Sequence, residues 1–328
     1  MNQNQIIDAI IAISMLIGVS GNVNVILAIA RKKILRTKRV LLILFLSIAH
    51  LICNITELNV LSQYYENIPF WSYPRCFKLD NFYIFVMNFQ SFLYLPIALD
   101  LFFSIVLPIK YKSWNTTRYV LAMLTFPIGL IIFYTFLSEY YSSDIKTVCL
   151  FGSGEWRELD NKGPFLLAYK ILKDLTVICN MSTTLIIIVS VVSAMIKSKC
   201  MHQNLSQTGG IEEEKVKVFR STFFMVVIHV GSWLLIISAD MFYGHLMSYW
   251  SIVDYMRLAV IPNVCQIYFV SYFGSPKLRK AYQEQIHCMT CGKLFPNIFK
   301  TEESQFTSTP NFENNDEECD DTLIRSQV

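Results

Sequence analysis

Long apolar stretches alternate along the chain with short polar connections. The apolar stretches lie roughly at 6–30, 40–63, 79–103, 118–137, 168–196, 218–243 and 252–273. A helix needs about 20 mostly apolar residues to cross a bilayer, and backbone with unpaired polar groups cannot face lipid. The pattern therefore predicts an all-α membrane protein, in which seven transmembrane helices pack into one bundle.

A short amphipathic helix is predicted directly after the last apolar stretch, over residues 276–287. Its apolar side holds Leu278, Ala281 and Tyr282, and its basic side holds Lys277, Arg279 and Lys280. A helix of this kind lies in the membrane interface. We expect an extracellular segment 1–5, a helical domain 6–287 and a cytosolic tail 288–328. The tail is rich in acids and poor in aliphatic residues from about 301, which predicts disorder there.

Composition favours a membrane protein over a soluble one. Of the 328 residues, 53% are hydrophobic and 16% are charged, which is too apolar for an ordinary soluble domain. The first apolar stretch could instead be a cleaved signal peptide. It has no basic leader, and six basic residues follow it, so a retained membrane helix is the better interpretation.

The placement of basic residues predicts how the chain threads through the membrane. The first connection, residues 31–39, carries six basic residues and no acid, and the later odd-numbered connections are also basic. The even-numbered connections are acidic or mixed. Short loops rich in Lys and Arg stay in the cytosol. We therefore expect the protein in the plasma membrane, with its N-terminus outside the cell and its C-terminus in the cytosol.

Most of the nine cysteines fall into three groups. Cys76 and Cys149 are the two on the predicted outer side, where a disulfide could form and tie the second outer loop to the bundle; two free thiols are the alternative. Cys288 and Cys291 follow the amphipathic helix and are candidates for palmitoylation, since a lone Cys-x-x-Cys lacks two of the ligands of a zinc site. We expect no metal and no cofactor. The third group comprises Cys53, Cys179 and Cys265, predicted to pack in the core.

Several motifs at definite spacing resemble those of rhodopsin-like G-protein-coupled receptors. Gly21-Asn22 lies in the first helix, "LSIAH" ends at His50 in the second, and Trp233 lies in the sixth. "ALDLFFSIVLPIKY" contains an Asp-x7-Pro-x-x-Tyr pattern. "LRTKRVLLILFLSIAHLIC" and "RCFKLDNFYIF" make the chain similar to the nematode serpentine receptor class SX (Srsx) family of chemoreceptors. The similarity covers about residues 10 to 285.

The resemblance implies a site for coupling to a heterotrimeric G protein at the cytosolic end of the third helix. In the family, the residue matching Asp100 begins an Asp-Arg-Tyr-like triplet whose arginine reaches the G protein. Here Leu101 follows Asp100, so that arginine is missing. We expect Asp100 either to pair with Lys110 or Lys112 or to mark the membrane interface. Pro108 and Tyr111 complete the candidate coupling residues.

Other family motifs are altered in the membrane interior. His50 replaces the acid of the usual sodium site, Leu235 stands where helix 6 normally has its proline, and helix 7 lacks Asn-Pro-x-x-Tyr. Asn22, His50 and Asn263 are predicted core polar residues. For His50 and His229 we expect a neutral imidazole satisfied by a nearby hydroxyl, with proton sensing as the alternative.

A ligand pocket is predicted in the outer half of the bundle, because polar groups inside a membrane mark functional sites. The candidate lining residues are Glu57, Tyr83, Met87, Lys170, Asp174, Trp233 and Arg257. Glu57 and Arg257 lie at similar depth on adjoining helices, which predicts an ion pair. That pair is either a static clamp or a group for which a ligand competes.

Four classes of function compete for this sequence. An enzyme is disfavoured, because the chain has no catalytic or phosphate-binding motif. A transporter or channel would need broken helices and charges at the midplane. The resemblance favours a receptor for an extracellular small molecule or peptide. It also implies a chemosensory cell, where a sensory cilium is the expected location. A decoy or scaffold without signalling stays open because of Leu101. The tail offers Ser and Thr residues for arrestin-like partners and a terminal Ser326-Gln327-Val328 for PDZ domains.

Overall fold

The computed structural model describes residues 3–65, 73–141, 147–148, 157–158, 164–202, 221–235 and 249–289. Side chains are described for 6–59, 82–83, 85–136, 170–196, 221–235, 258–259 and 261–286. The chain divides into two units at Gln283. The helical bundle belongs to the first unit, Met1–Gln283.

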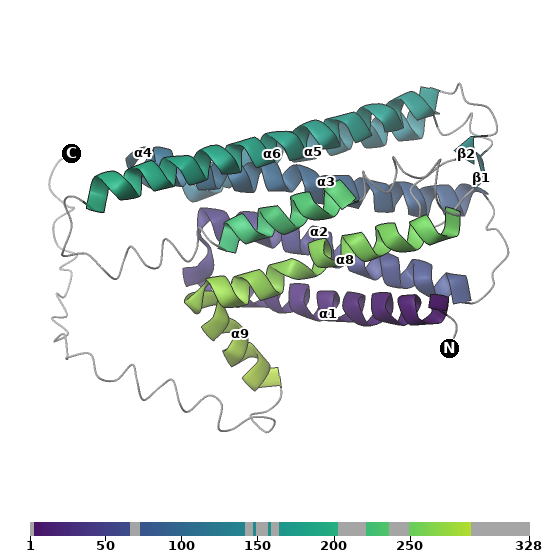
Figure 1. Ribbon diagram of the computed structural model, residues 1–328, viewed down its shortest axis with the longest axis horizontal. Coiled ribbons are helices and arrows are strands. Elements are labelled where there is room, and N and C mark those ends of the chain that lie inside the picture. Colours follow the sequence, from purple (N-terminus) through teal and green to yellow (C-terminus); the bar gives the residue numbers. More distant parts are fainter. Residues whose placement is uncertain are drawn as a thin grey trace, which may run out of the picture. The chain divides into compact units, whose positions relative to one another are not determined.

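Long helices account for nearly all of the described residues (Figure 1). The helices are α1 Gln3–Arg31, α2 Lys38–Tyr65, α3 Tyr73–Val106, α4 Pro108–Ser113, α5 Thr116–Tyr141, α6 Pro164–His202, α8 Tyr249–Gly274 and α9 Pro276–Met289. An apolar helix at Ser221–Leu235 lies between α6 and α8 in the sequence. The predicted all-α membrane fold is confirmed, and most helices extend a few residues beyond their predicted apolar stretches.

Three elements of two or three residues each were not predicted from the hydrophobic pattern. A 3-10 turn, η1 Lys33–Leu35, joins α1 to α2. Strands β1 Thr147–Val148 and β2 Arg157–Glu158 pair antiparallel. Elements of two or three residues are too short to leave a periodic signal.

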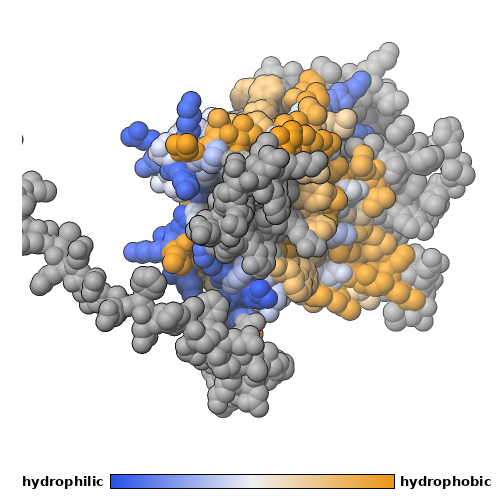
Figure 2. All heavy atoms as spheres, turned by 60° about the vertical axis from the view of Figure 1, so that its left-hand side comes forward, coloured by the Kyte–Doolittle hydropathy of each residue, from blue (hydrophilic) through white to orange (hydrophobic). Residues whose placement is uncertain are grey.

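Five of the described helices are long and apolar enough to cross a membrane. These spans are Ile6–Arg31, Lys38–Asn59, Phe85–Val106, Thr116–Phe136 and Lys170–Ile196. Many of their large apolar side chains are exposed, among them Leu121, Ile132 and Phe136 on α5 and Ile178, Met181 and Leu185 on α6. Figure 2 shows hydrophobic side chains over much of one face and hydrophilic ones gathered toward one end. Exposed apolar surface of this extent suits lipid rather than water.

The helices pack in a definite order. Helix α3 contacts α2, α5 and α6, while α1 packs against α2 and α8. Small residues allow the close approach of α1: a methyl group at Gly21 would lie 2.8 Å from Tyr268 Cβ on α8. The Asn22 side-chain amide donates to the Val264 carbonyl oxygen at 3.1 Å, which joins the same two helices. Small residues at membrane helix contacts have this role in general.

The amphipathic helix predicted after the last span is α9. Leu278, Ala281 and Tyr282 are buried on one side of it, while Lys277 and Lys280 are exposed. Burial raises the pKa of the Tyr282 phenol. The arrangement fits an interfacial helix that has one buried apolar face and one basic face.

Candidate functional site

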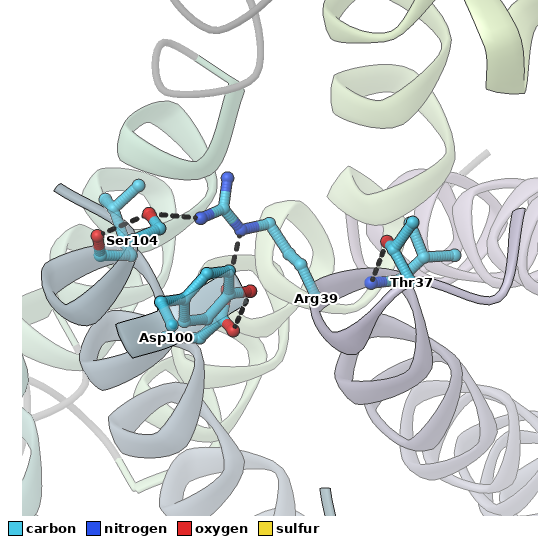
Figure 3. A network of polar contacts seen from close by, with 7 residues as sticks. Thr37, Arg39, Asp100 and Ser104 are labelled. Carbon is cyan, nitrogen blue, oxygen red and sulfur yellow. Dashed lines mark hydrogen bonds and ion pairs between the residues drawn. The ribbon is translucent and has the colours of Figure 1, made fainter. Parts of the chain in front are cut away.

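The first part of the site is the junction between α1 and α2, where the chain turns through residues 31–39. Thr37 lies just before the first residue of α2, and its Oγ1 accepts a hydrogen bond from the Val40 amide at 3.5 Å. This is the usual N-cap arrangement. Arg39 is therefore fixed in the first turn of α2, and its side chain extends toward α3 (Figure 3).

Asp100 and Arg39 form an ion pair between α3 and α2. Arg39 Nε donates to Asp100 Oδ2 at 2.8 Å, and Arg39 Nη2 donates to Ser104 Oγ at 3.0 Å. The Asp100 side chain is fully buried, and that of Arg39 is 14% exposed. A charge-assisted bond in such an environment is strong, and an unpaired carboxylate there would be costly. The pair therefore fixes the first turn of α2 against α3.

The second Asp100 oxygen accepts a hydrogen bond from the short helix α4 that follows α3. Tyr111 Oη donates to Asp100 Oδ1 at 2.7 Å. Pro108 is the first residue of α4, where the backbone N–H that proline lacks would have no partner within the helix. The short helix that it starts brings Tyr111 back toward α3. Burial, and then the neighbouring Asp100 carboxylate, raise the pKa of the Tyr111 phenol. The phenol therefore stays a donor at neutral pH.

Lys38 reinforces this cluster from α2. Its ammonium donates to the Tyr111 carbonyl oxygen and lies 4.3 Å from the centre of the Tyr111 ring. Trp114 and Tyr119 stack with ring centres 5.5 Å apart beside it. Cation–π contacts of this kind favour a fixed ammonium. The start of α2, the end of α3 and the short helix α4 are thus joined by polar and aromatic contacts.

These contacts correct the expectation for Asp100. Lys110 and Lys112 are exposed, and Arg39 rather than either of them is the partner of Asp100. Asp100 is also fully buried and does not mark the interface. The sequence predicted a basic run at 31–39 but could not select one of its six bases, because only the packing of α2 on α3 makes Arg39 the base that reaches the carboxylate. Ser104 was missed for the same reason.

Leu101, where the family has an arginine, is 1% exposed and belongs to the apolar core. The position is therefore an ordinary packing site in this chain. Near the same end of the bundle, two isoleucines are the most exposed of the described large apolar residues: Ile34 on η1 at 80% and Ile109 on α4 at 85%. Both have lysine neighbours, Lys33 and Lys110, which are also exposed. We call this surface the basic end, defined by residues 31–39 and 107–118.

A polar network lies deeper in the bundle, around His229. His229 Nδ1 lies 2.9 Å from Asn263 Oδ1 on α8, and His229 Nε2 lies 3.0 Å from Asn180 Oδ1 on α6. The Tyr94 ring on α3 stacks on the imidazole with centroids 3.6 Å apart. Gln266 Nε2 donates to Tyr94 Oη at 2.7 Å. All five side chains are buried.

The two deep histidines differ from what we expected of them. His229 contacts the side-chain amides of Asn180 and Asn263 rather than a hydroxyl, and neither ring nitrogen of His50 has a hydrogen-bond partner among the described residues. His50, Asn22 and Asn263 are all buried. Asn180 and Gln266 were missed, because amides inside an apolar run give no signal of which helix they face.

The half of the bundle away from the basic end holds Glu57 and Tyr83. Glu57 is 5% exposed, and Tyr83 Oη donates to its Oε1. Glu57 lies 18 residues beyond Arg39 on α2, about 27 Å along the helix. The Trp233 ring centre lies 6.4 Å from that of His229, and Met87 accepts from Gln90 Nε2. Lys170 and Asp174 are exposed on α6.

Several predicted site residues lie outside the described side chains. These are Cys76, Cys149, Arg257, Cys288 and Cys291, together with the tail from residue 290. The Glu57–Arg257 ion pair, the outer disulfide, lipidation and the tail motifs therefore stay predictions. Cys53, Cys179 and Cys265 are free thiols, and the first two are buried. No cluster of three potential metal ligands occurs among the described residues.

Comparison with known families identifies the class of protein to which the chain belongs. The model of the serpentine type seven-transmembrane G-protein-coupled chemoreceptors, Srsx, matches residues 15–286. No curated protein matches the chain. The family is a class of non-enzymatic membrane receptors, which generally take extracellular ligands and G-protein partners. With its multi-pass helical fold and a family match over most of its length, the chain belongs to the Srsx family of serpentine seven-transmembrane chemoreceptors.

Proposed function

We propose that this protein is a chemosensory receptor that binds an extracellular small molecule or peptide and activates a heterotrimeric G protein at the basic end. The observation that carries the proposal is the contact of Asp100 with Arg39 and Tyr111. A fully buried carboxylate is retained at the end of α3 although the usual arginine beside it is not. The charge that it needs comes from α2 instead.

This contact suits a switch between two bundle states. Three separate elements, α2, α3 and α4, meet at one carboxylate. A movement of any of them must break a charge-assisted bond, so the cluster favours one arrangement over others. A ligand shifts such an equilibrium only as far as it binds one state more tightly. A second state in which Arg39 leaves Asp100 would place a free guanidinium on the surface offered to a G protein.

The threading of the chain is proposed from the same residues. Exposed Lys33, Lys110 and Lys112 at the basic end support a cytosolic position for that end. Exposed Ile34 and Ile109 offer apolar contacts between those charges. The ligand would then enter the opposite half, which lies outside. We place the receptor in the plasma membrane, with a sensory cilium as the specialised location.

The ligand-binding group we propose is Glu57 with Tyr83. A carboxylate that is 5% exposed on α2 and bonded to a phenol on α3 offers a ligand one buried charge with a neighbouring donor. Met87 and Trp233 lie deeper, on α3 and on the helix Ser221–Leu235. The proposed pocket is completed by Arg257, Lys170 and Asp174. A disulfide between Cys76 and Cys149 would hold the outer loop over it.

The test is a ligand screen in cells that express the receptor with a promiscuous Gα subunit and a calcium reporter. We expect at least one ligand to raise calcium in wild-type cells and to lose its effect on Glu57→Gln. Glu284→Gln, at an exposed carboxylate of α9 that is not one of the proposed pocket residues, is the matched control and should keep the calcium response. If labelled ligands bind at the surface but no Gα subunit responds, the signalling proposal fails.

A decoy or scaffold is the second candidate, and Leu101 is the observation that favours it. This leucine carries no charge, and its side chain is buried in the apolar core, so a partner protein cannot contact a charged group at this position. The screen separates the two candidates, because a decoy binds ligand without a calcium response. Arrestin-like and PDZ partners of the tail are compatible with either candidate.

A further inference from the structure

The helix Ser221–Leu235 is tied to its neighbours through one imidazole. His229 contacts Asn180 of α6 through one ring nitrogen and Asn263 of α8 through the other. Tyr94 of α3 covers a face of the ring, with 17° between the two planes. Four helices therefore meet at a side chain that is fully buried. In an apolar environment, a polar group of these side chains that has no hydrogen-bond partner destabilises the bundle.

The hydrogen bonds around Asn263 indicate which nitrogen of His229 carries the proton. Asn263 Oδ1 accepts from Tyr94 Oη at 3.2 Å and from Gln266 Nε2 at 3.1 Å. An amide oxygen is an acceptor only, so with Asn263 in this orientation His229 Nδ1, 2.9 Å away, carries a proton and donates. His229 Nε2 is then unprotonated in the neutral ring and has only a lone pair to offer.

The Asn180 amide must then present its nitrogen, as a donor, to the unprotonated His229 Nε2. As placed, Asn180 Oδ1 faces His229 Nε2, while Asn180 Nδ2 has no hydrogen-bond partner among the described residues. Exchanging the two atoms of this amide lets Nδ2 donate to the imidazole lone pair and satisfies both groups at once. Amide oxygen and nitrogen positions are assigned from the hydrogen-bond network in just this way. The alternative, an imidazolium that donates from both ring nitrogens, would leave Asn180 Nδ2 unpaired and bury a cation.

We propose that His229, as its neutral Nδ1–H tautomer, is the positioning residue that holds the helix Ser221–Leu235 against α6 and α8. Trp233 lies one turn along the same helix, and its ring packs edge-on against that of His229. A ligand that moves Trp233 therefore strains the two hydrogen bonds of His229. This regulation rests on the proposed receptor function, but the hydrogen-bond assignment does not depend on signalling.

The first experiment measures the tautomer in the wild-type receptor in lipid nanodiscs. The chain has 5 histidines, so ¹⁵N-histidine labelling gives a small set of imidazole signals, and the one absent from His229→Asn belongs to His229. We expect a protonated, pyrrole-type Nδ1 and a pyridine-type Nε2. A protonated Nε2, alone or together with Nδ1, would overturn the proposal. No G protein is needed for this measurement.

The second experiment compares variants for ligand-independent calcium signalling and for thermal denaturation. His229→Phe keeps an aromatic ring and removes both hydrogen bonds; we expect a lower melting temperature and about tenfold more ligand-independent signal, the size expected for lost coupling in one network. His229→Asn keeps a donor where Nδ1 was, and should stay within about threefold of wild type. Thr176→Val is the control, because Thr176 joins α6 to Asn88 of α3 outside this network.

The outcomes separate the two proposals. A rise in signal in His229→Phe but not in Thr176→Val supports the positioning role. Equal rises in both variants, or none in His229→Phe, contradict it. If the wild type and all variants are silent with every Gα subunit while the tautomer is as assigned and His229→Phe melts earlier, the proposed function fails and the hydrogen-bond assignment stands.

Discussion

Arg39 Nε donates to Asp100 Oδ2 at 2.8 Å across 61 residues of sequence. The bond places a base from the start of α2 beside a carboxylate whose own neighbour, Leu101, is buried in the core. A buried carboxylate needs a compensating charge, but that charge can come from any element that reaches it. In this protein it comes from Arg39 on α2, because the residue next to Asp100 is an uncharged leucine.

Replacing Arg39 with alanine should destabilise the receptor by about 3 kcal/mol, because it leaves the Asp100 carboxylate buried without its cation. The measurement is the denaturation midpoint in nanodiscs. Arg118→Ala removes an exposed base of the same basic end and should change stability by less than about 0.5 kcal/mol. Equal losses of stability in the two variants would show that the Arg39–Asp100 pair contributes no more to stability than an exposed base does.

Leu101→Arg should have opposite effects in two backgrounds. In the wild type Arg39 already neutralises the Asp100 carboxylate, so a second arginine there buries a positive charge without a carboxylate of its own and lowers stability. In Arg39→Ala the same substitution supplies the missing cation and should raise the melting temperature. From the family resemblance alone, one would expect a simple gain from this arginine. A double-mutant cycle should give a coupling of about 1–2 kcal/mol, and strict additivity would refute the exchange of partners.

Tyr111→Phe should lower stability by about 1.5 kcal/mol at neutral pH, since it removes a hydrogen bond to a carboxylate. The pKa of the Tyr111 phenol is raised in the folded protein, first by burial and then by Asp100. A raised folded-state pKa gives a contribution that is complete below the ordinary tyrosine value of about 10 and is lost as the pH rises above it. Melting curves of the two proteins should therefore keep a constant offset up to about pH 10 and converge beyond it. An offset that shrinks toward acid pH would argue against this assignment.

Gly21→Ala tests the close packing of α1 on α8. The new methyl group would lie 2.8 Å from Tyr268 Cβ and 3.2 Å from its Cγ, so the helices must separate, at a cost of about 2 kcal/mol. Gly129→Ala on α5 is the matched control, because nothing lies within 4 Å of its added methyl group. We expect that variant to melt within about 2 °C of wild type. An unchanged melting temperature in Gly21→Ala would mean that α1 can move away from α8 without destabilising the bundle.

Much of the fold could be predicted because each span carries its own signal. Apolar stretches at 6–30 and 40–63 became α1 and α2 with ends shifted by a few residues, since transfer into lipid depends on residues within one stretch. The amphipathic pattern around Leu278 and Tyr282 likewise placed α9. The candidate residue Asp100 was also recognised from its spacing to Pro108 and Tyr111, and the bond between Asp100 and Tyr111 explains that spacing.

The linear order of the residues was enough to establish a bundle of membrane helices with a basic end and a few polar groups inside, because burial in lipid and the period of a helix are local properties. Which of those polar groups meet was settled by the packing of the helices. Arg39 was one base of six, and Asn180 was one amide in a long apolar helix, until the packing of α2 on α3 and of α6 beside His229 selected them. The reason is that hydrogen bonds and ion pairs depend on distances between helices, and no single stretch of sequence contains those distances.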